Sequence, residues 1–201
     1  MARPARILAT ARRLPREERG AAAIEFALAA PVFLMMIMGI FDIGHMAYSK
    51  AVLSGAVQEA ARTSAMEGAD TAEADEKVMD VVGPVIPGVE IESTRTSYFD
   101  FTDIGRPEKW NDSNKDGECD GGETYTDENG NSQWDADIGR GGNGGSGDVV
   151  LYHVEMTYKP LFPIPLMTDR GGTRTLSATA VKKNQPFGTQ EGYGSKAGSC
   201  A

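Results

Sequence analysis

Histidine and cysteine are scarce in this chain, which has two of each among its 201 residues. With only His45 and His153 as ordinary bases, no base stands near a nucleophile in a recognisable catalytic pattern, so we expect no enzymatic activity. Cys119 and Cys200 could pair if they lie outside the cytoplasm, but one pair does not make a disulfide scaffold. The sequence leaves that pairing open.

Positive charge is also in short supply, with 20 Lys and Arg against 29 Asp and Glu and a net charge of −9. Residues 1–20 carry +4 through six arginines and two glutamates, so residues 21–201 carry −13. Nucleic-acid binding needs a basic footprint, and this balance argues against it. The glycine-rich run 141–145 lacks the lysine that follows a phosphate-binding loop.

One long apolar run stands out at residues 21–43, where Glu25 and Asp42 are the only charged side chains. A helix of this length measures about 35 Å, which is enough to cross the roughly 30 Å hydrocarbon core of a bilayer. The run is too long for a secretory signal peptide. Because arginine-rich flanks stay in the cytoplasm, we expect residues 1–20 inside and the rest of the chain outside.

Glu25 is the most informative residue of this run. A carboxylate within a spanning helix costs about 2.5 to 3.5 kcal/mol on insertion scales and needs a partner. If the chain is cut between Gly20 and Ala21, the new α-amino group of Ala21 is a cation one helical turn from Glu25. That amine could come from the same chain or from a neighbouring copy.

The basic leader, Gly20 before the cut and Glu25-Phe26 opening an apolar helix are similar to the start of type IV prepilins. Residues 19–62 resemble the TadE-like family of minor pseudopilins from tight-adherence pili. The resemblance implies that a prepilin peptidase cuts the chain after Gly20. The residues of this processing site are Gly20, Ala21, Glu25 and Phe26. The resemblance also implies anchoring in the bacterial inner membrane with a periplasmic domain, followed by assembly with other pilin or pseudopilin subunits on the cell surface.

The remaining pattern predicts an α+β fold. Small residues at three- and four-residue spacing continue the transmembrane helix as an amphipathic helix, giving one helix over residues 21–66. A short helix is expected at 72–82, and alternating β-branched residues predict strands at 89–98, 149–158 and 173–183. We therefore expect a long helix packed on a small antiparallel sheet in an exported domain, residues 67–183, and a flexible tail at 184–201.

An acidic insertion separates the first two predicted strands. Residues 100–148 hold 13 Asp or Glu and four Lys or Arg, too much charge to bury a core unless a cation neutralises it. Oxygen ligands recur there at the spacing of a twelve-residue EF-hand-type calcium loop with glycine at place 6. Those at places 1, 3, 5, 7, 9 and 12 are Asp112, Asn114, Asp116, Glu118, Asp120 and Glu123.

A degraded second copy follows at once. Its candidate Ca²⁺ ligands are Asp127, Asn129, Asn131, Gln133 and Asp135, with Asp137 as a substitute for the missing closing acid. Ser132 replaces the glycine and Ile138 stands at place 12. We expect bare calcium loops without flanking helices, with affinities on the order of 10⁻⁴ to 10⁻³ M. The alternative is a solvated acidic loop whose asparagines and glycines only make turns.

Two functions fit these features. The chain is either a structural or assembly-priming minor subunit of a tight-adherence pilus, or a membrane-anchored calcium-dependent binding or adhesion module outside the cytoplasm. The two differ at Gly20, since only the first requires a cut there. The sequence favours the first.

Overall fold

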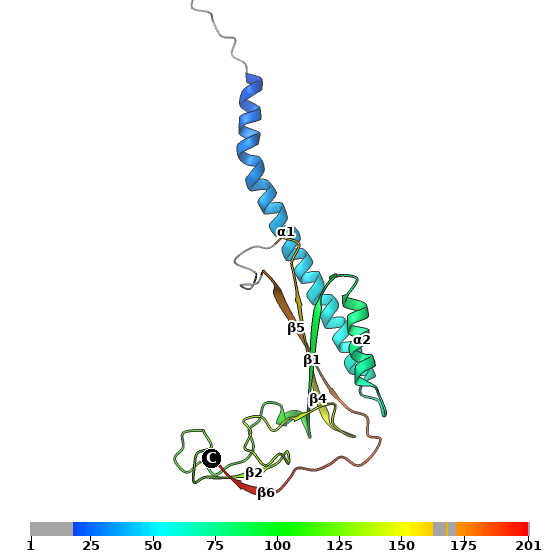
Figure 1. Cartoon of the computed structure of the whole chain (residues 1–201), viewed down its shortest axis with the longest axis vertical. Coiled ribbons are helices and arrows are strands. Elements are labelled where there is room, and N and C mark those ends of the chain that lie inside the picture. Colours follow the sequence, from blue (N-terminus) through cyan, green and yellow to red (C-terminus); the bar gives the residue numbers. More distant parts are fainter. Residues whose placement is uncertain (1–17, 163–167, 169–171, 201) are drawn as a thin grey trace, which may run out of the picture.

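The computed structural model describes residues 18–162, 168 and 172–200. It confirms the α+β fold. Helix α1, Glu18–Thr63, is a single rod whose N-terminal half projects beyond the rest of the molecule (Figure 1). It ends three residues before the predicted boundary at 66. Of the predicted leader, residues 1–17 lie outside the described part of the chain.

The N-terminal half of α1 meets the requirements of a membrane span by length and composition. Its best 18-residue window has a mean hydropathy of 2.2, and none of that window is buried within the protein. Phe26, Leu28 and Phe41 are each more than two-thirds exposed. Exposed apolar surface on this scale marks a lipid or protein contact, and it supports membrane anchoring through α1.

A second helix, α2 Thr71–Val82, lies beside the C-terminal half of α1 (Figure 1). Asp70 caps it, because its Oδ1 accepts a hydrogen bond from the Ala72 backbone N–H at 2.8 Å. Ala74, Val78 and Val82 recur at four-residue spacing and are buried. This apolar stripe is why α2 packs inward and leaves Glu73, Glu76 and Asp80 exposed.

The three predicted strands are present as β1 Glu90–Tyr98, β4 Val149–Tyr158 and β5 Arg174–Lys183. They form an antiparallel sheet in the order β3-β1-β4-β5, to which Arg140–Gly141 adds the short strand β3. On the helix side Tyr152, Val154 and Met156 are fully buried. The opposite face carries polar residues such as His153 and Glu155, and this alternation is typical of a sheet with one solvated side.

The main core lies between the two helices and this sheet. The C-terminal half of α1 contributes small and medium apolar residues, which let the helix approach the strands closely. The fully or nearly fully buried members from α1 are Leu53, Val57, Ala60 and Ala61. A smaller cluster of Tyr98, Ile138 and Val149 lies at the far end of the sheet. That end carries the acidic insertion.

Asp75 of α2 joins the helical layer to the sheet. Its carboxylate accepts hydrogen bonds from Ser93 at 2.8 Å, from Arg95 at 2.7 and 3.0 Å, and from the Tyr152 hydroxyl. Burial alone would raise the pKa of Asp75, but the hydrogen bonds from Arg95, Tyr152 and Ser93 outweigh it and lower that pKa. Arg95 also lies over the Tyr152 ring, 4.1 Å from its centroid.

We expect Asp75→Asn to destabilise the domain formed by the helices and the sheet by about 2 kcal/mol, because it removes a charged acceptor shared by three donors. Since the folded pKa is below the unfolded value, the Asp75 contribution is present above about pH 4 and is lost as pH falls through the folded pKa. Denaturant unfolding at pH 7 and pH 3 should show a smaller difference between wild type and variant at pH 3. An equal difference at both pH values would contradict the assignment.

The insertion contains regular structure of its own. The 3-10 helix η1 Phe101–Asp103 follows β1, and β2 Thr124–Asp127 pairs antiparallel with β6 Lys196–Ser199. Cys119 and Cys200 form a disulfide. Residues 184–200 thus differ from the flexible tail predicted from their composition, because strand pairing and a covalent bond fasten them to the insertion.

Between β4 and β5 the sequence predicts an irregular apolar loop, because Pro160, Pro163 and Pro165 cannot donate to a strand ladder. Most of that loop, at 163–167 and 169–171, lies outside the described residues.

Candidate functional site

The first acidic loop, residues 112–123, curls around its own carboxylates. Asp112 accepts hydrogen bonds from the backbone N–H groups of Lys115 at 2.6 Å and Gly117 at 3.1 Å. These donors are places 4 and 6 of the loop, so the chain turns tightly around place 1. Gly117 has a φ of +84°, a conformation that glycine adopts without strain and that the sequence pattern requires at place 6.

The closing acid of this loop lies under it. Glu123 is 5 % exposed, and its two carboxylate oxygens accept from the backbone N–H of Ser113 at 2.7 Å and of Asp120 at 3.3 Å. Its own backbone N–H donates to the Asp120 carbonyl at 3.0 Å. Glu123 therefore bridges places 2 and 9 of the loop.

Oxygen atoms from alternate places converge in the same loop. The Asn114 amide donates to Asp116 at 2.7 Å and to Asp120 at 3.3 Å. A hydrogen bond with Asp116 and that neighbour's charge raise the pKa of Asp120, while a backbone N–H of Glu118 and the Asn114 amide help lower that of Asp116. Two carboxylates thus compete within a few ångströms, and a bound cation would relieve their repulsion.

The second loop, beginning at Asp127, repeats this bonding. Asp127 accepts from the backbone N–H groups of Gly130, Asn131 and Ser132 at 2.6 to 3.1 Å. The Asn129 and Asn131 amides both donate to Asp135, at 2.7 and 2.6 Å. Ser132 occupies the glycine place with a φ of +64°, so the backbone keeps the required turn at a residue that adopts it less readily.

Glu108, a residue that sequence reasoning missed, takes the closing position of the second loop. It is fully buried, and its carboxylate accepts from the backbone N–H of Glu128 at 2.7 Å and of Asp135 at 3.3 Å. Its own N–H donates to the Asp135 carbonyl at 3.0 Å. These are again places 2 and 9, so Glu108 repeats all three bonds that Glu123 makes in the first loop.

A repeat of 15 residues explains why Glu108 and Glu123 take equivalent positions in the two loops. Glu108 stands four residues before Asp112, as Glu123 stands four residues before Asp127. The two repeats pair antiparallel at Trp110 and Tyr125. Each glutamate lies on one of the two paired segments and bonds the loop that follows the other segment. The indole rings of Trp110 and Trp134 also pack edge to face, with centroids 5.4 Å apart. The loops form one paired module.

Other predicted ligands are placed differently. The Asp137 carboxylate accepts from the Tyr98 hydroxyl at 2.8 Å and from the Gly139 N–H at 3.0 Å, so the second loop is closed by Glu108 instead. Glu118 and Gln133 contribute backbone N–H groups, to Asp116 and Asn131. Within the described ranges no group of three or more His, Cys, Asp or Glu side chains is arranged as a metal site, since these carboxylates are spread over backbone donors.

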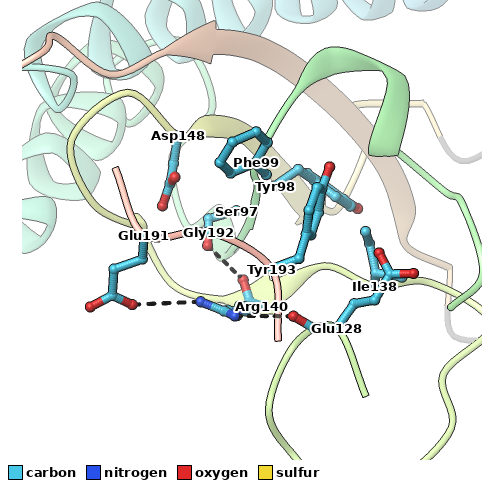
Figure 2. Close-up of a pocket in the computed structure, with 10 residues that line it drawn as sticks. All are labelled: Ser97, Tyr98, Phe99, Glu128, Ile138, Arg140, Asp148, Glu191, Gly192 and Tyr193. Atoms are coloured by element: carbon cyan, nitrogen blue, oxygen red, sulfur yellow. Dashed lines mark hydrogen bonds and ion pairs between the residues drawn. The ribbon is translucent and has the colours of Figure 1, made fainter. Parts of the chain in front are cut away.

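The C-terminal segment, residues 184–200, holds this module against the sheet. Arg140 forms an ion pair with Glu191 at 3.7 Å and donates to the Glu128 carbonyl at 3.2 Å (Figure 2). Tyr193 packs on Phe99 with ring centroids 4.7 Å apart, and its hydroxyl bonds Asp103. The cavity enclosed here measures about 30 Å³, which is room for a water molecule and not for a ligand. The contact is structural.

Arg106 is the central cation of the module. It pairs with Asp103 at 2.9 Å and with the buried Glu128 at 2.7 Å, and its pKa is raised mainly by the hydrogen bond with Glu128. Glu128 also accepts from the Lys109 backbone N–H at 3.2 Å. Arg106 therefore neutralises a carboxylate that stands beside the first ligand of the second loop.

The predicted processing residues lie in the exposed N-terminal part of α1. Gly20, Ala21, Glu25 and Phe26 are all exposed, and the helix places Ala21 and Glu25 one turn apart on the same side. Among the described residues Glu25 has no ion-pair partner. Its carboxylate thus remains available for an amine from another chain.

Comparison with known proteins identifies this helix. The family model described as TadE-like protein matches residues 20–62, which run almost to the end of α1. No curated protein and no solved structure matches the chain. The resemblance predicted from the sequence is thereby confirmed over residues 20–62, where the chain is similar to the TadE-like family.

Proposed function

We propose that this chain is a minor pilin, a structural or assembly-priming subunit of a tight-adherence type IV-like pilus. One observation carries the proposal: the TadE-like match covers the helix whose apolar half is exposed and bears Glu25 near its start. In this role a prepilin peptidase cuts after Gly20. The mature chain then waits in the inner membrane, with its domain in the periplasm, until it joins other subunits.

Glu25 supplies the chemical reason for assembly. A carboxylate in hydrocarbon is stabilised by a cation, and the α-amino group of Ala21 in a neighbouring subunit provides one after cleavage. The rod α1 can then pack beside other helices while the acidic module stays at the far end of the molecule (Figure 1). This arrangement supports an exposed position for the module on the assembled pilus.

The test is N-terminal sequencing of the protein from cells, combined with the Glu25→Ala variant. We expect the mature protein to begin at Ala21, and Glu25→Ala to be cut normally but to lose at least about tenfold in pilus incorporation, because an unpaired amine in lipid is costly. Glu59→Ala, which removes an exposed carboxylate from the same helix, is the matched control and should assemble normally. An intact leader in the assembled protein would favour a tethered binding module.

We also propose that the paired loops bind two Ca²⁺ ions. The support is the shared arrangement of the two loops, each with alternate oxygen donors and a buried closing glutamate. In the first site Asp112, Asn114, Asp116 and Glu123 would hold the ion, and in the second Asp127, Asn129, Asn131 and Glu108. Place 7 supplies its backbone carbonyl in such loops, so Glu118 and Gln133 need not turn inward.

Terbium luminescence, excited through the indole of Trp134 within the second loop, can separate the two sites. We expect Glu108→Gln to weaken that luminescence titration by about tenfold, or about 1.4 kcal/mol, while Glu123→Gln affects mainly the first loop. Asp137→Asn is the control and should change little, because its carboxylate bonds Tyr98 and Gly139. Calorimetry that detects no heat at millimolar Ca²⁺ would remove the calcium proposal and leave the pilus role untouched.

The proposal includes no catalytic step. His153, one of two histidines, hydrogen-bonds Thr179 at 2.8 Å and Glu155 at 3.2 Å on the solvated face of the sheet. This bonding supports a surface role for His153, in agreement with its position on the partly exposed side of the alternating strand β4.

A further inference from the structure

A basic groove interrupts the acidic surface at the β5 edge of the sheet. It lies between α1 and β5, has a volume of about 470 Å³, and is lined by Gln58, Ala61, Arg62, Ala65 and residues 179–183. Arg62, Lys182 and Lys183 supply its charge. The segment 21–201 carries −13, so three cations gathered at one edge need an explanation.

These cations differ from most other arginines of the described chain. Arg95, Arg106, Arg140 and Arg174 each pair with a carboxylate of the same molecule. In the described part of the chain, neither Arg62 nor Lys182 nor Lys183 has a carboxylate within 4.0 Å. Burial and the charge of Arg95 lower the pKa of Lys182 to about 8, which agrees with an ammonium that no anion compensates.

An acidic ridge lies on the other side of α1. Glu73, Glu76 and Asp80 are exposed on the face of α2 that points away from its buried stripe. Among the residues that the structure describes, Lys77 alone forms an ion pair with one of them, Glu73, at 2.9 Å. Helix α2 lies over β1, to which Asp75 bonds, whereas the groove opens at β5, the opposite edge of the strand order.

The two surfaces also stand at one level along the rod. The groove is lined by Gln58, Ala61 and Arg62 of α1 and by Ala65 just after it, and α2 begins beside Thr63 and Met66 at the same end of the helix. Arg62 lies 19 residues beyond Ile43, about 28 Å along the helix, which is too far to reach lipid headgroups around the apolar run. An acidic protein surface is therefore the fitting occupant.

We propose that the basic groove of one copy receives the acidic α2 ridge of a second copy of this chain. The contact joins two different surfaces, so it is heterologous: each copy keeps a free groove or a free ridge for the next subunit unless the contacts close into a ring. The inference rests on the proposed role as an assembling subunit and adds a contact outside the membrane. Being made by exposed charges, the contact weakens as salt increases.

Full-length chains carrying two different tags, reconstituted together in vesicles of neutral lipid, provide the test. Arg62→Cys in one copy and Glu76→Cys in the other should give a mixed-tag adduct with a short bismaleimide, since the native cysteines are already bonded. Lys159→Cys replaces Arg62→Cys in the control. It places an exposed cysteine directly after β4, away from the groove, and should give no adduct.

Charge exchange separates this contact from general proximity. Arg62→Glu with Lys183→Glu should reduce co-purification of the two tags several-fold, and adding Glu76→Lys with Asp80→Lys should restore it. Circular dichroism checks that each variant is folded. A mixed-tag adduct that is insensitive to charge reversal, or no adduct between Arg62→Cys and Glu76→Cys, would overturn the inference. Cleavage after Gly20 and the Glu25→Ala phenotype would still stand in either case, so the pilus role is judged separately.

Discussion

Replacing both cysteines, as Cys119→Ser with Cys200→Ser, should destabilise the acidic module by about 4 kcal/mol. The bond joins residues 81 apart in sequence, and a cross-link over that separation removes a large loop entropy from the unfolded chain. It also ties place 8 of the first loop to the segment that pairs with β2. Hydrogen exchange should show loss of protection in β2 and β6 while β4 and β5 keep theirs.

Two controls accompany this prediction. Alkylation of the exported protein without reductant should label neither cysteine, and alkylation after reduction should label both. The double serine variant should weaken terbium binding at the first loop more than at the second, because Trp134 occupies place 8 there instead of a cysteine. Free thiols in freshly isolated protein would contradict the pairing.

Asp42→Ala should destabilise the packing of α1 on the sheet by about 3 to 5 kcal/mol, the usual effect of removing one member of a buried ion pair. Asp42 is 2 % exposed and Arg174 5 %, and their Oδ2 and guanidinium nitrogen lie 2.7 Å apart. The change leaves the Arg174 guanidinium buried without that carboxylate. Denaturant unfolding of the full chain in micelles, followed by circular dichroism of the sheet, measures the loss.

A second variant distinguishes charge from packing at this site. Asp42→Leu combined with Arg174→Leu removes both charges and should recover most of the stability, since apolar residues of similar volume often replace buried pairs without loss. Asp80→Ala, an exposed carboxylate of α2, should stay within about 0.5 kcal/mol of wild type. If Asp42→Ala behaves like Asp80→Ala, the pair does not hold the helix to the sheet.

Local pattern was sufficient for the main elements. A cap at Asp70-Thr71 and the valines at 78, 81 and 82 predicted α2, although Val81 is exposed in the structure. Alternation of β-branched residues predicted β1, β4 and β5 to within one residue. These signals depend on neighbours a few positions apart. The long helix was predicted from its apolar run and small-residue spacing, and it ends at Thr63 because the chain turns there towards Gly68, with a φ of +68°.

Contacts between residues far apart in the sequence could not be predicted from local pattern. Glu108 closes a loop that begins 19 residues later. The spacing pattern of a calcium loop covers only the twelve residues of the loop itself, so it could not predict a ligand from outside. Comparing the two copies over 15 residues, including the positions before each first aspartate, would have found it. The sequence of β6, Lys-Ala-Gly-Ser, has no alternating apolar pattern that would predict a strand. It is ordered because it pairs with β2 and because the next residue, Cys200, is bonded to Cys119.

The separation of Cys119 from Cys200 has a consequence for the order of events during export. In the proposed topology the leader stays in the cytoplasm and the chain beyond α1 crosses the membrane in sequence order, so Cys119 emerges 81 residues ahead of Cys200. The strands β4 and β5 lie within that interval and can pair before the bond exists. While Cys200 is still absent, the Cys119 thiol can be oxidised or can form a disulfide with another protein. Oxidative folding catalysts would therefore determine the yield of molecules with the Cys119–Cys200 disulfide.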